Sequence, residues 1–333
     1  MKKIFLLPFV IFAFVFTTAQ DNKQLHETGK TFLRQGDYSN AILVLNRALQ
    51  SDPKNAAIIK DLALSYYLQK DNGKALETIK LLLDRDDADD QAYQIAGNIY
   101  KQSDEPKEAE KIYKKALKKF PDNGPLYNDL GELLWSQKNF EAIKQWEKGI
   151  EQDPSYSKNY YNASRYYFLT TDKVWSILYG EIFVNMEPLS SRTPEIKQIL
   201  LDSYKKIYTD ADMEQGNKDK NAFVKKYLQG MNKQMPIAET GINAESLSMI
   251  RTRFILNWYN DKTNAKYPYR LFEQQQQLLR EGLFEAYNQW LFGASQNLSA
   301  YQSWINMHAR EAESFSKFQS GRIFKIPSGQ YYK

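Results

Sequence analysis

A repeating pattern with a period of about 34 residues constrains the fold of this 333-residue chain more than any other feature. It occurs five times between residues 22 and 190, with one residue deleted in the fourth unit. In the first half of each unit, large residues three or four positions apart flank a small residue. In the second half, an alanine or serine comes four positions before a residue that is usually large. The small residues of the first half are Gly29, Ala63, Gly97, Gly131 and Ser164. The alanine or serine residues of the second half are Ala41, Ala75, Ala109, Ala142 and Ser176.

These spacings are typical of paired amphipathic helices. Steps of 3, 1 and 3 place the large residues on one helical stripe. The small residue lets two antiparallel helices approach closely, and we expect the alanine of the second helix, such as Ala142 opposite Gly131, to face it. Proline closes most units, for example at Pro53 and Pro154, because it cannot donate the intrahelical hydrogen bond. The pattern therefore predicts an all-α chain of stacked helical hairpins.

The pattern resembles the tetratricopeptide repeat, whose signature is W-x2-L-G-x2-Y, then A-x3-F, then P, at a period of about 34 residues. The resemblance covers about half of the chain and implies a helical solenoid with a concave binding face. The chain departs from the family in two respects: the signature tryptophan is missing from every first helix, and the fifth unit has Gly180 and Phe183 at unusual places. The implied repeats are 22–55, 56–89, 90–123, 124–156 and 157–190.

The remainder of the chain is also predicted to be helical. We expect a capping helix at 191–208, a polar linker at 209–220 and a C-terminal helical region at 221–333. Within the last region the apolar spacing predicts helices at about 221–233, 245–260, 270–291 and 297–319. Residues 244–333 contain 17 aromatic residues, which argues for a folded domain or for one that docks on the repeats.

The N-terminus is typical of an exported protein. Two lysines precede an uninterrupted apolar run, Ile4–Phe16, and Thr17 and Ala19 occupy the positions that a signal peptidase reads. Such a run is too short to cross a bilayer, because it rises only about 20 Å. We expect residues 1–19 to be a signal peptide and the mature chain to begin at Gln20. The Ala-Gln junction resembles exported proteins of Bacteroidetes bacteria, so the expected location is the periplasm, the cell envelope or outside the cell.

Composition and motifs point to no catalytic, metal or cofactor site. The chain has no cysteine, and its formal charge of +5 is too small to argue for nucleic acid. No phosphate-binding glycine loop, nucleophile elbow or zinc-protease motif is present. His308 is expected on a buried helical seam. Glu281 and Glu285 are expected on one solvated helix face.

The predicted binding site is a stripe on the first helices of the repeats. Helix positions five, nine and twelve share a face turned away from the packed one, and amides, cations and large apolar residues alternate there. Apolar pockets can hold the side chains of an extended peptide while amides bond its backbone. The predicted peptide-binding residues are Gln94, Asn98, Lys101, Asn128, Trp135, Tyr161, Arg165 and Phe168.

We therefore expect an exported scaffold that binds another protein or peptide through its concave face. One alternative is a cell-envelope enzyme with an unrecognised catalytic site in the C-terminal helices. Another is a peripheral membrane protein that uses its aromatic, basic C-terminus. A further possibility is that the C-terminal region itself covers the stripe.

Overall fold

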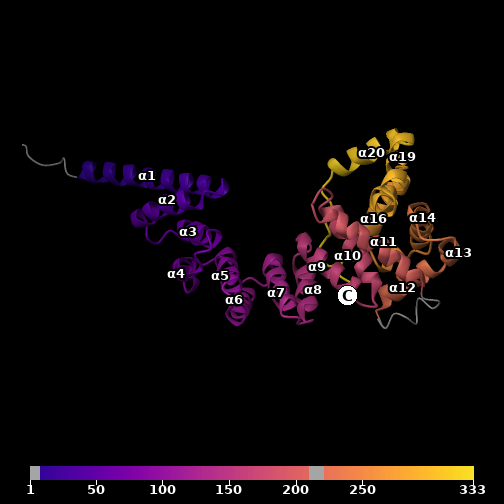
Figure 1. Cartoon of the computed structure of the whole chain (residues 1–333), viewed down its shortest axis with the longest axis horizontal. Coiled ribbons are helices and arrows are strands. Elements are labelled where there is room, and N and C mark those ends of the chain that lie inside the picture. Colours follow the sequence, from indigo (N-terminus) through magenta and orange to yellow (C-terminus); the bar gives the residue numbers. More distant parts are fainter. Residues whose placement is uncertain (1–7, 210–220) are drawn as a thin grey trace, which may run out of the picture. The chain divides into compact units, whose positions relative to one another are not determined.

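The computed structural model describes residues 8–209 and 221–333, and side chains from residue 21 onward; every regular element in these ranges is a helix (Figure 1). Residues 1–7 of the expected signal peptide and 210–220 of the expected linker lie outside the described residues. The chain divides into two compact units, the first ending at Lys138 and the second beginning at Asn139. Each unit is described separately below.

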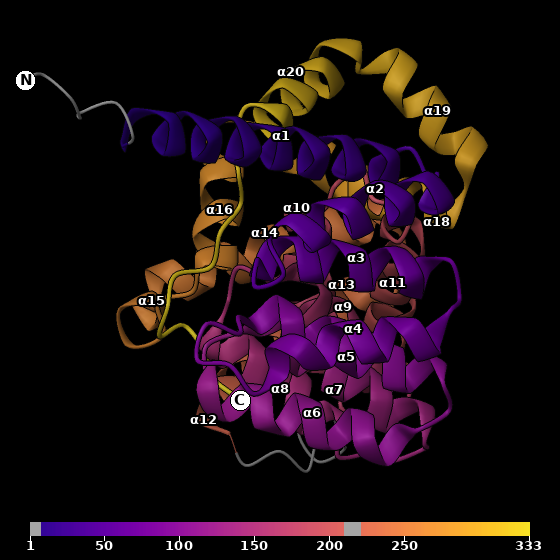
Figure 2. The ribbon, with the colours of Figure 1, turned by 90° about the vertical axis from the view of Figure 1, so that its left-hand side faces the viewer.

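The first unit consists of three helical hairpins followed by α7, which succeed one another in chain order (Figure 2). As predicted, the second helix of the first and third hairpins ends two residues before a proline, at Ser51 and Lys119. The helices are α1 (Pro8–Arg34), α2 (Tyr38–Ser51), α3 (Ala56–Leu68), α4 (Asn72–Leu83), α5 (Asp90–Gln102), α6 (Pro106–Lys119) and α7 (Gly124–Ser136).

The turn inside each hairpin uses a left-handed residue. Gly36, Lys70, Asp104 and Lys138 have φ values of 77°, 67°, 58° and 58° and are spaced by one repeat period. In the first three turns, the next residue's amide donates back to the carbonyl five residues earlier, at 2.9–3.0 Å. This is the Schellman arrangement, which satisfies carbonyls that the end of the helix leaves unpaired.

In the first and third repeats, the small residue contacts a different partner from the one expected, whereas in the fifth Ser164 contacts Ser176 as expected. A Cβ atom on Gly29 would lie 2.6 Å from the Leu45 side chain, and one on Gly97 would lie 2.3 Å from the Tyr113 ring. These partners lie four residues beyond the alanines that were expected to face the glycines. The large residue of the second helix thus packs directly over the glycine, while Ala41 and Ala109 are fully buried beside it.

The second unit begins with α8 (Ala142–Gln152) and the fifth hairpin, α9 (Ser157–Phe168) and α10 (Lys173–Met186), followed by α11 (Thr193–Thr209). Every residue of α10 from Val174 to Val184 is buried, because α9 and α11 pack against it and C-terminal aromatics cover its start. A helix that is buried on all sides needs no polar face. This explains why the fifth repeat departs from the family pattern: a Cβ on Gly180 would lie 2.7 Å from Ser164 Oγ and 3.1 Å from Leu200.

The C-terminal helices pack around α14, which contacts α12, α13, α15, α16, α17 and η1. Two of the expected helices are interrupted. The one predicted at 270–291 breaks at Gly282, where φ is +70°, and the one predicted at 297–319 breaks at His308. The elements are α12 (Ala222–Asn232), α13 (Met235–Ala238), α14 (Ala244–Asn260), α15 (Thr263–Lys266), α16 (Arg270–Arg280), α17 (Phe284–Asn288), the π-helix η1 (Gln289–Gly293), α18 (Ala294–Gln296), α19 (Leu298–Met307) and α20 (Ala309–Ser320).

A buried polar network joins the fifth repeat to these helices. Glu181 on α10 and Arg251 on α14 are each 1% exposed and form an ion pair. The same carboxylate oxygen of Glu181 also accepts hydrogen bonds from Gln275 at 2.6 Å and from the Tyr287 hydroxyl at 2.7 Å. Arg251 donates a second hydrogen bond to Asn288. The repeat hairpin and the C-terminal helices therefore share one core in this unit.

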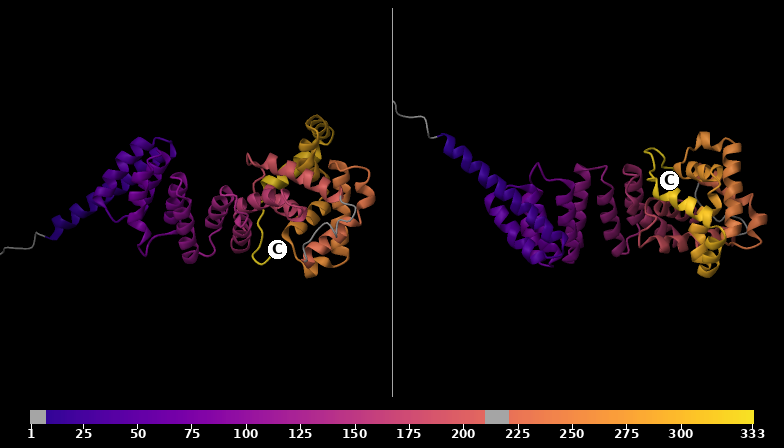
Figure 3. Two further views of the ribbon diagram at one scale, coloured as in Figure 1. Left: turned by 60° about the horizontal axis from the view of Figure 1, so that its bottom comes forward. Right: turned by 90° about the horizontal axis from the view of Figure 1, so that it is seen from above.

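The last residues form an extended tail after α20. Phe324 and Ile326 are buried and residues 327–329 are exposed, after which the chain packs against the unit again. Figure 3 shows this tail running back along the second unit to the C-terminal marker. Within the part of the chain that the structure describes, no helix combines the length and apolar character needed to cross a bilayer.

Candidate functional site

The inner stripe, defined as positions five, nine and twelve of the first helices, is largely half-buried in the first unit. Of its twelve residues there, only Asn128 is fully buried, at 1% exposure. A half-buried stripe that includes apolar groups is a surface that can still bind a ligand. The residues are His26, Lys30, Leu33, Lys60, Leu64, Tyr67, Gln94, Asn98, Lys101, Asn128, Glu132 and Trp135.

Position five of the stripe links neighbouring repeats. His26 Nε2 lies 2.7 Å from Asp61 Oδ2, and the Gln94 amide donates to Asp129 Oδ2 at 2.7 Å. Both partners lie 35 residues further along the chain. These polar groups therefore hold one repeat against the next, in addition to forming part of the inner stripe.

Asp129 is a buried neighbour of two predicted site residues, Gln94 and Asn128, which both donate hydrogen bonds to its carboxylate. Burial raises the pKa of its carboxyl group, and the hydrogen bond from Gln94 opposes that shift. Burial also raises the pKa of the Tyr67 and Tyr113 hydroxyls, and the charge of Asp129 adds to both shifts. Both tyrosines consequently remain neutral hydrogen-bonding groups on this face.

The remaining predicted residues of the first unit differ in whether they can contact a ligand directly or only position a neighbouring group. Asn98 Oδ1 accepts a hydrogen bond from Tyr113 at 2.9 Å, which directs its amide group. Lys101 Nζ lies 3.8 Å from Glu132, a loose pair at the edge of the stripe. Asn128 is buried and donates to Glu132 at 3.2 Å, so its role is to position that carboxylate. Trp135 is half-buried.

The three predicted residues of the second unit gather around Glu195 and basic side chains. The Tyr161 hydroxyl donates to Glu195 at 2.6 Å, and Arg165 Nε lies 2.8 Å from the same carboxylate. Lys206 Nζ lies 4.6 Å from the centre of the Phe168 ring. Arg165 thus already has an acidic partner within the protein. The sequence pattern missed Glu195 because it lies outside the repeats.

The family comparison agrees with this geometry. A profile of the tetratricopeptide repeat matches residues 32–99, and a second profile of the same repeat matches residues 90–133. These residues belong to the tetratricopeptide repeat family. No curated protein matches the sequence.

Solved tetratricopeptide repeat proteins resemble the chain over about half its length. PilF of Pseudomonas aeruginosa shares 16% identity with a TM-score of 0.50, over 59% of this chain and 88% of that one. TTC0263 of Thermus thermophilus shares 14% identity with a TM-score of 0.44, over 55% and 98%. YrrB, described as having an unusual peptide-binding site, shares 16% identity with a TM-score of 0.39, over 52% and 90%. The likeness to PilF shows the fold alone.

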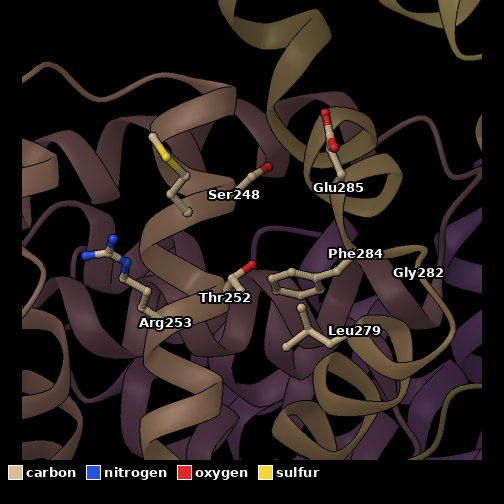
Figure 4. Close-up of a pocket in the computed structure, with 8 residues that line it drawn as sticks. Ser248, Thr252, Arg253, Leu279, Gly282, Phe284 and Glu285 are labelled. Atoms are coloured by element: carbon tan, nitrogen blue, oxygen red, sulfur yellow. The ribbon is translucent and has the colours of Figure 1, made fainter.

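The helices beyond the tetratricopeptide repeats contain an open pocket of about 400 Å³ between α14, α16 and α17. Ser248, Thr252, Arg253 and Glu285 line it, but Arg253 and Glu285 point away from each other (Figure 4). The Ser248 hydroxyl donates to the Ala244 carbonyl of its own helix at 3.0 Å. This arrangement places no base beside a nucleophile.

Two other sequence candidates take different positions from those expected. His308 is half-buried at the break between α19 and α20, and its ring stacks on Trp304 with centres 4.6 Å apart. Glu281 and Glu285 do not share a helix face, because Gly282 separates α16 from α17. Among residues 21–209 and 221–333, no cluster of three or more histidines and carboxylates could hold a metal ion.

Proposed function

We propose that this chain is an exported scaffold that binds an extended segment of another protein along the inner stripe of its tetratricopeptide repeats. The observation that carries the proposal is the half-buried stripe of the first unit, which includes large apolar groups and an amide oriented by a hydrogen bond. A face whose only role was contact with water would not need Leu64, Tyr67 and Trp135. Solenoids of this family type present such faces as extended binding surfaces.

Asn98 is the residue best placed to hold a peptide backbone. Its oxygen is engaged by Tyr113, which leaves the amide hydrogens directed away from that bond. An amide that donates to a backbone carbonyl binds without reading side chains. Trp135 and Tyr67 supply apolar surface, and aromatic residues of this kind dominate binding hot spots.

The charges at the edge of the stripe favour a segment that contains an acidic residue. A ligand carboxylate near Lys101 would replace the loose contact with Glu132, which is 3.8 Å long. In the second unit, an acidic residue would compete with Glu195 for Arg165. Gln94 and Asn128 complete the proposed site in the first unit, where they position its polar groups. In the second unit, Tyr161 and Phe168 border Arg165.

A capture experiment tests the proposed site. The full chain, purified from the envelope fraction of the producing cells under crosslinking, should retain a defined protein. Asn98→Asp keeps the oxygen that Tyr113 needs but removes the donor, so it should lower retention by at least about tenfold. Gln50→Glu makes the same chemical change at an exposed position on α2 and should not alter retention. Equal retention by both variants, with unchanged melting temperature, would remove the stripe as the binding site.

Export is the second part of the proposal and rests on the N-terminal sequence. Thr17 and Ala19 fit the pocket of a signal peptidase, so the mature protein should begin at Gln20. Intact-mass analysis of protein from the producing cells decides this point. A retained Met1, or a start far from Gln20, contradicts it.

A further inference from the structure

The extended tail after α20 packs into a slot on the second unit. It leaves α20, passes α16 and α15 and ends near α12 (Figure 2). Phe324 and Ile326 anchor its first part, at 7% and 6% exposure. An exposed turn follows, in which Gly329 has φ +84°. Residues 330–333 then return to the surface, so they form a second docked piece joined to the first by a solvent-exposed hinge.

The slot recognises the backbone and side chain of the tyrosine at position 332. The Tyr332 ring stacks on Phe223 with ring centres 4.7 Å apart and an angle of 20°. Its hydroxyl donates to the Pro268 carbonyl at 2.6 Å, and the Asn221 amide donates to the Tyr332 carbonyl. Asn221 uses its oxygen to cap α12, so the start of that helix fixes the amide in place.

The neighbouring positions of the slot recognise a lysine and a glutamine. Lys333 Nζ lies 3.5 Å from Asp172 Oδ2 and 5.1 Å and 5.5 Å from the ring centres of Tyr167 and Trp175. A carboxylate beside two aromatic faces is a setting that selects a cation. The Gln330 side chain accepts a hydrogen bond from the Arg270 amide at the start of α16, at 2.6 Å.

We propose that this slot is a second peptide site, which binds a partner segment carrying an aromatic residue followed directly by lysine or arginine, and that residues 330–333 occupy it in the absence of that partner. The slot contacts are those of a peptide complex: stacked rings, a backbone carbonyl held by an amide, and one ion pair. The hinge at 327–329 lets the occupant leave while Phe324 and Ile326 keep the tail attached. The slot is built from different residues than the inner stripe, so its test does not depend on the function proposed above.

The test uses the full-length protein and a fluorescent peptide with the sequence of residues 322–333. The unaltered protein should bind the peptide weakly, because its own tail competes. The double variant Tyr332→Ser, Lys333→Ser should release the tail and bind the peptide at least tenfold more tightly. Equal binding by both proteins, or no binding by the folded double variant, overturns the proposal.

A charge exchange shows whether the peptide occupies the slot. Adding Asp172→Lys to the double variant should abolish binding, and a peptide with glutamate in place of its last lysine should restore it. Binding that ignores the charge at position 172 overturns the proposal.

A second measurement keeps Tyr332 and Lys333 unchanged, so the tail retains its contacts with the slot. Because the natural chain has no cysteine, an environment-sensitive dye attaches only at position 328 of the Ser328→Cys variant. Saturating peptide should change the dye signal as the tail leaves the slot. A peptide with serine in place of the tyrosine that corresponds to Tyr332 should have no effect, and an equal effect contradicts the proposal.

Discussion

At the scale of single residues, the hairpin turns hold side chains in a conformation that glycine adopts more readily. Lys70 has φ 67°, where a residue with a Cβ atom is strained by about 1–2 kcal/mol. Only the first of the four equivalent turns has glycine, at Gly36. The repeat therefore tolerates this strain because the Schellman hydrogen bonds and the packed helices fix the turn.

Replacing Lys70 by glycine should stabilise the first unit. Lys70→Gly removes the strained Cβ, and we expect unfolding to require about 1 kcal/mol more. Glu77→Gly, at an exposed position in the middle of α4, should instead cost about 1 kcal/mol. Urea unfolding of both variants measures the difference. Destabilisation by both changes would show that the turn is not strained.

Lys197 on α11 is a half-buried titratable group that lies against an aromatic ring. Burial lowers its pKa to about 7, and its Nζ lies 3.7 Å from the centre of the Trp290 ring. No salt bridge joins it to a residue in the described part of the chain. In the unfolded chain a lysine keeps its proton up to about pH 10.4. The folded state therefore binds fewer protons between these pH values, and its stability falls as the pH falls from about 10 to 7.

Lys197→Met should remove this pH dependence. The variant's stability advantage should grow as the pH falls from 10 to 7 and then level off. Urea unfolding at pH 7 and pH 9.5 measures it. Lys205→Met, at a surface position of the same helix, serves as the control. The same advantage at both pH values would mean that Lys197 is not neutralised by folding.

At the scale of elements, the repeat pattern predicted the hairpins well because each side chain's role recurs in every unit. In the C-terminal region, the prediction from apolar spacing failed where a single residue ends a helix, as Gly282 and His308 do. Apolar spacing alone does not show such breaks, since it continues across them. Gly180 and Phe183 indicate only that the fifth repeat packs differently from the others. They do not predict that α10 is buried, because some of the residues that bury it, such as Phe223, lie far along the sequence.

The candidate site shows the same limit. Positions five, nine and twelve were found from the repeat, and the structure places them on a half-buried stripe in the first unit. The burial of Asn128 and the pairing of Arg165 with Glu195 depend on tertiary neighbours that the pattern does not specify. Covering of the stripe by the C-terminal region stays an alternative. The structure adds that Tyr332 and Lys333 contact the slot on the second unit.

The ion pair between α10 and α14 offers a test of how the second unit is held together. Arg251→Met would leave the buried Glu181 carboxylate without its cation and should cost about 3–5 kcal/mol. Glu181→Leu should cost a similar amount, since the Arg251 guanidinium would then be buried without its carboxylate. The double variant should lose clearly less than the sum of the two. Additive losses in urea unfolding would mean that the pair contributes no coupling.

At the scale of the whole molecule, the chain combines tetratricopeptide repeats with a C-terminal helical region that lies outside the matched residues. The first unit carries the tetratricopeptide repeats, whose faces are suited to extended ligands. The second unit merges the fifth hairpin with C-terminal helices through a buried polar network and an aromatic core. Each unit thus presents its own proposed peptide site, the inner stripe and the tail slot.

Site-directed photocrosslinking in the producing cells tests the central claim most directly. A photoreactive residue at Lys101 would lie at the edge of the inner stripe, and one at Lys111 on α6 would lie on an exposed helix outside it. The account predicts a discrete crosslinked protein from position 101 and none from position 111. Crosslinks of equal strength from both positions, or none from position 101 in folded protein, would contradict it.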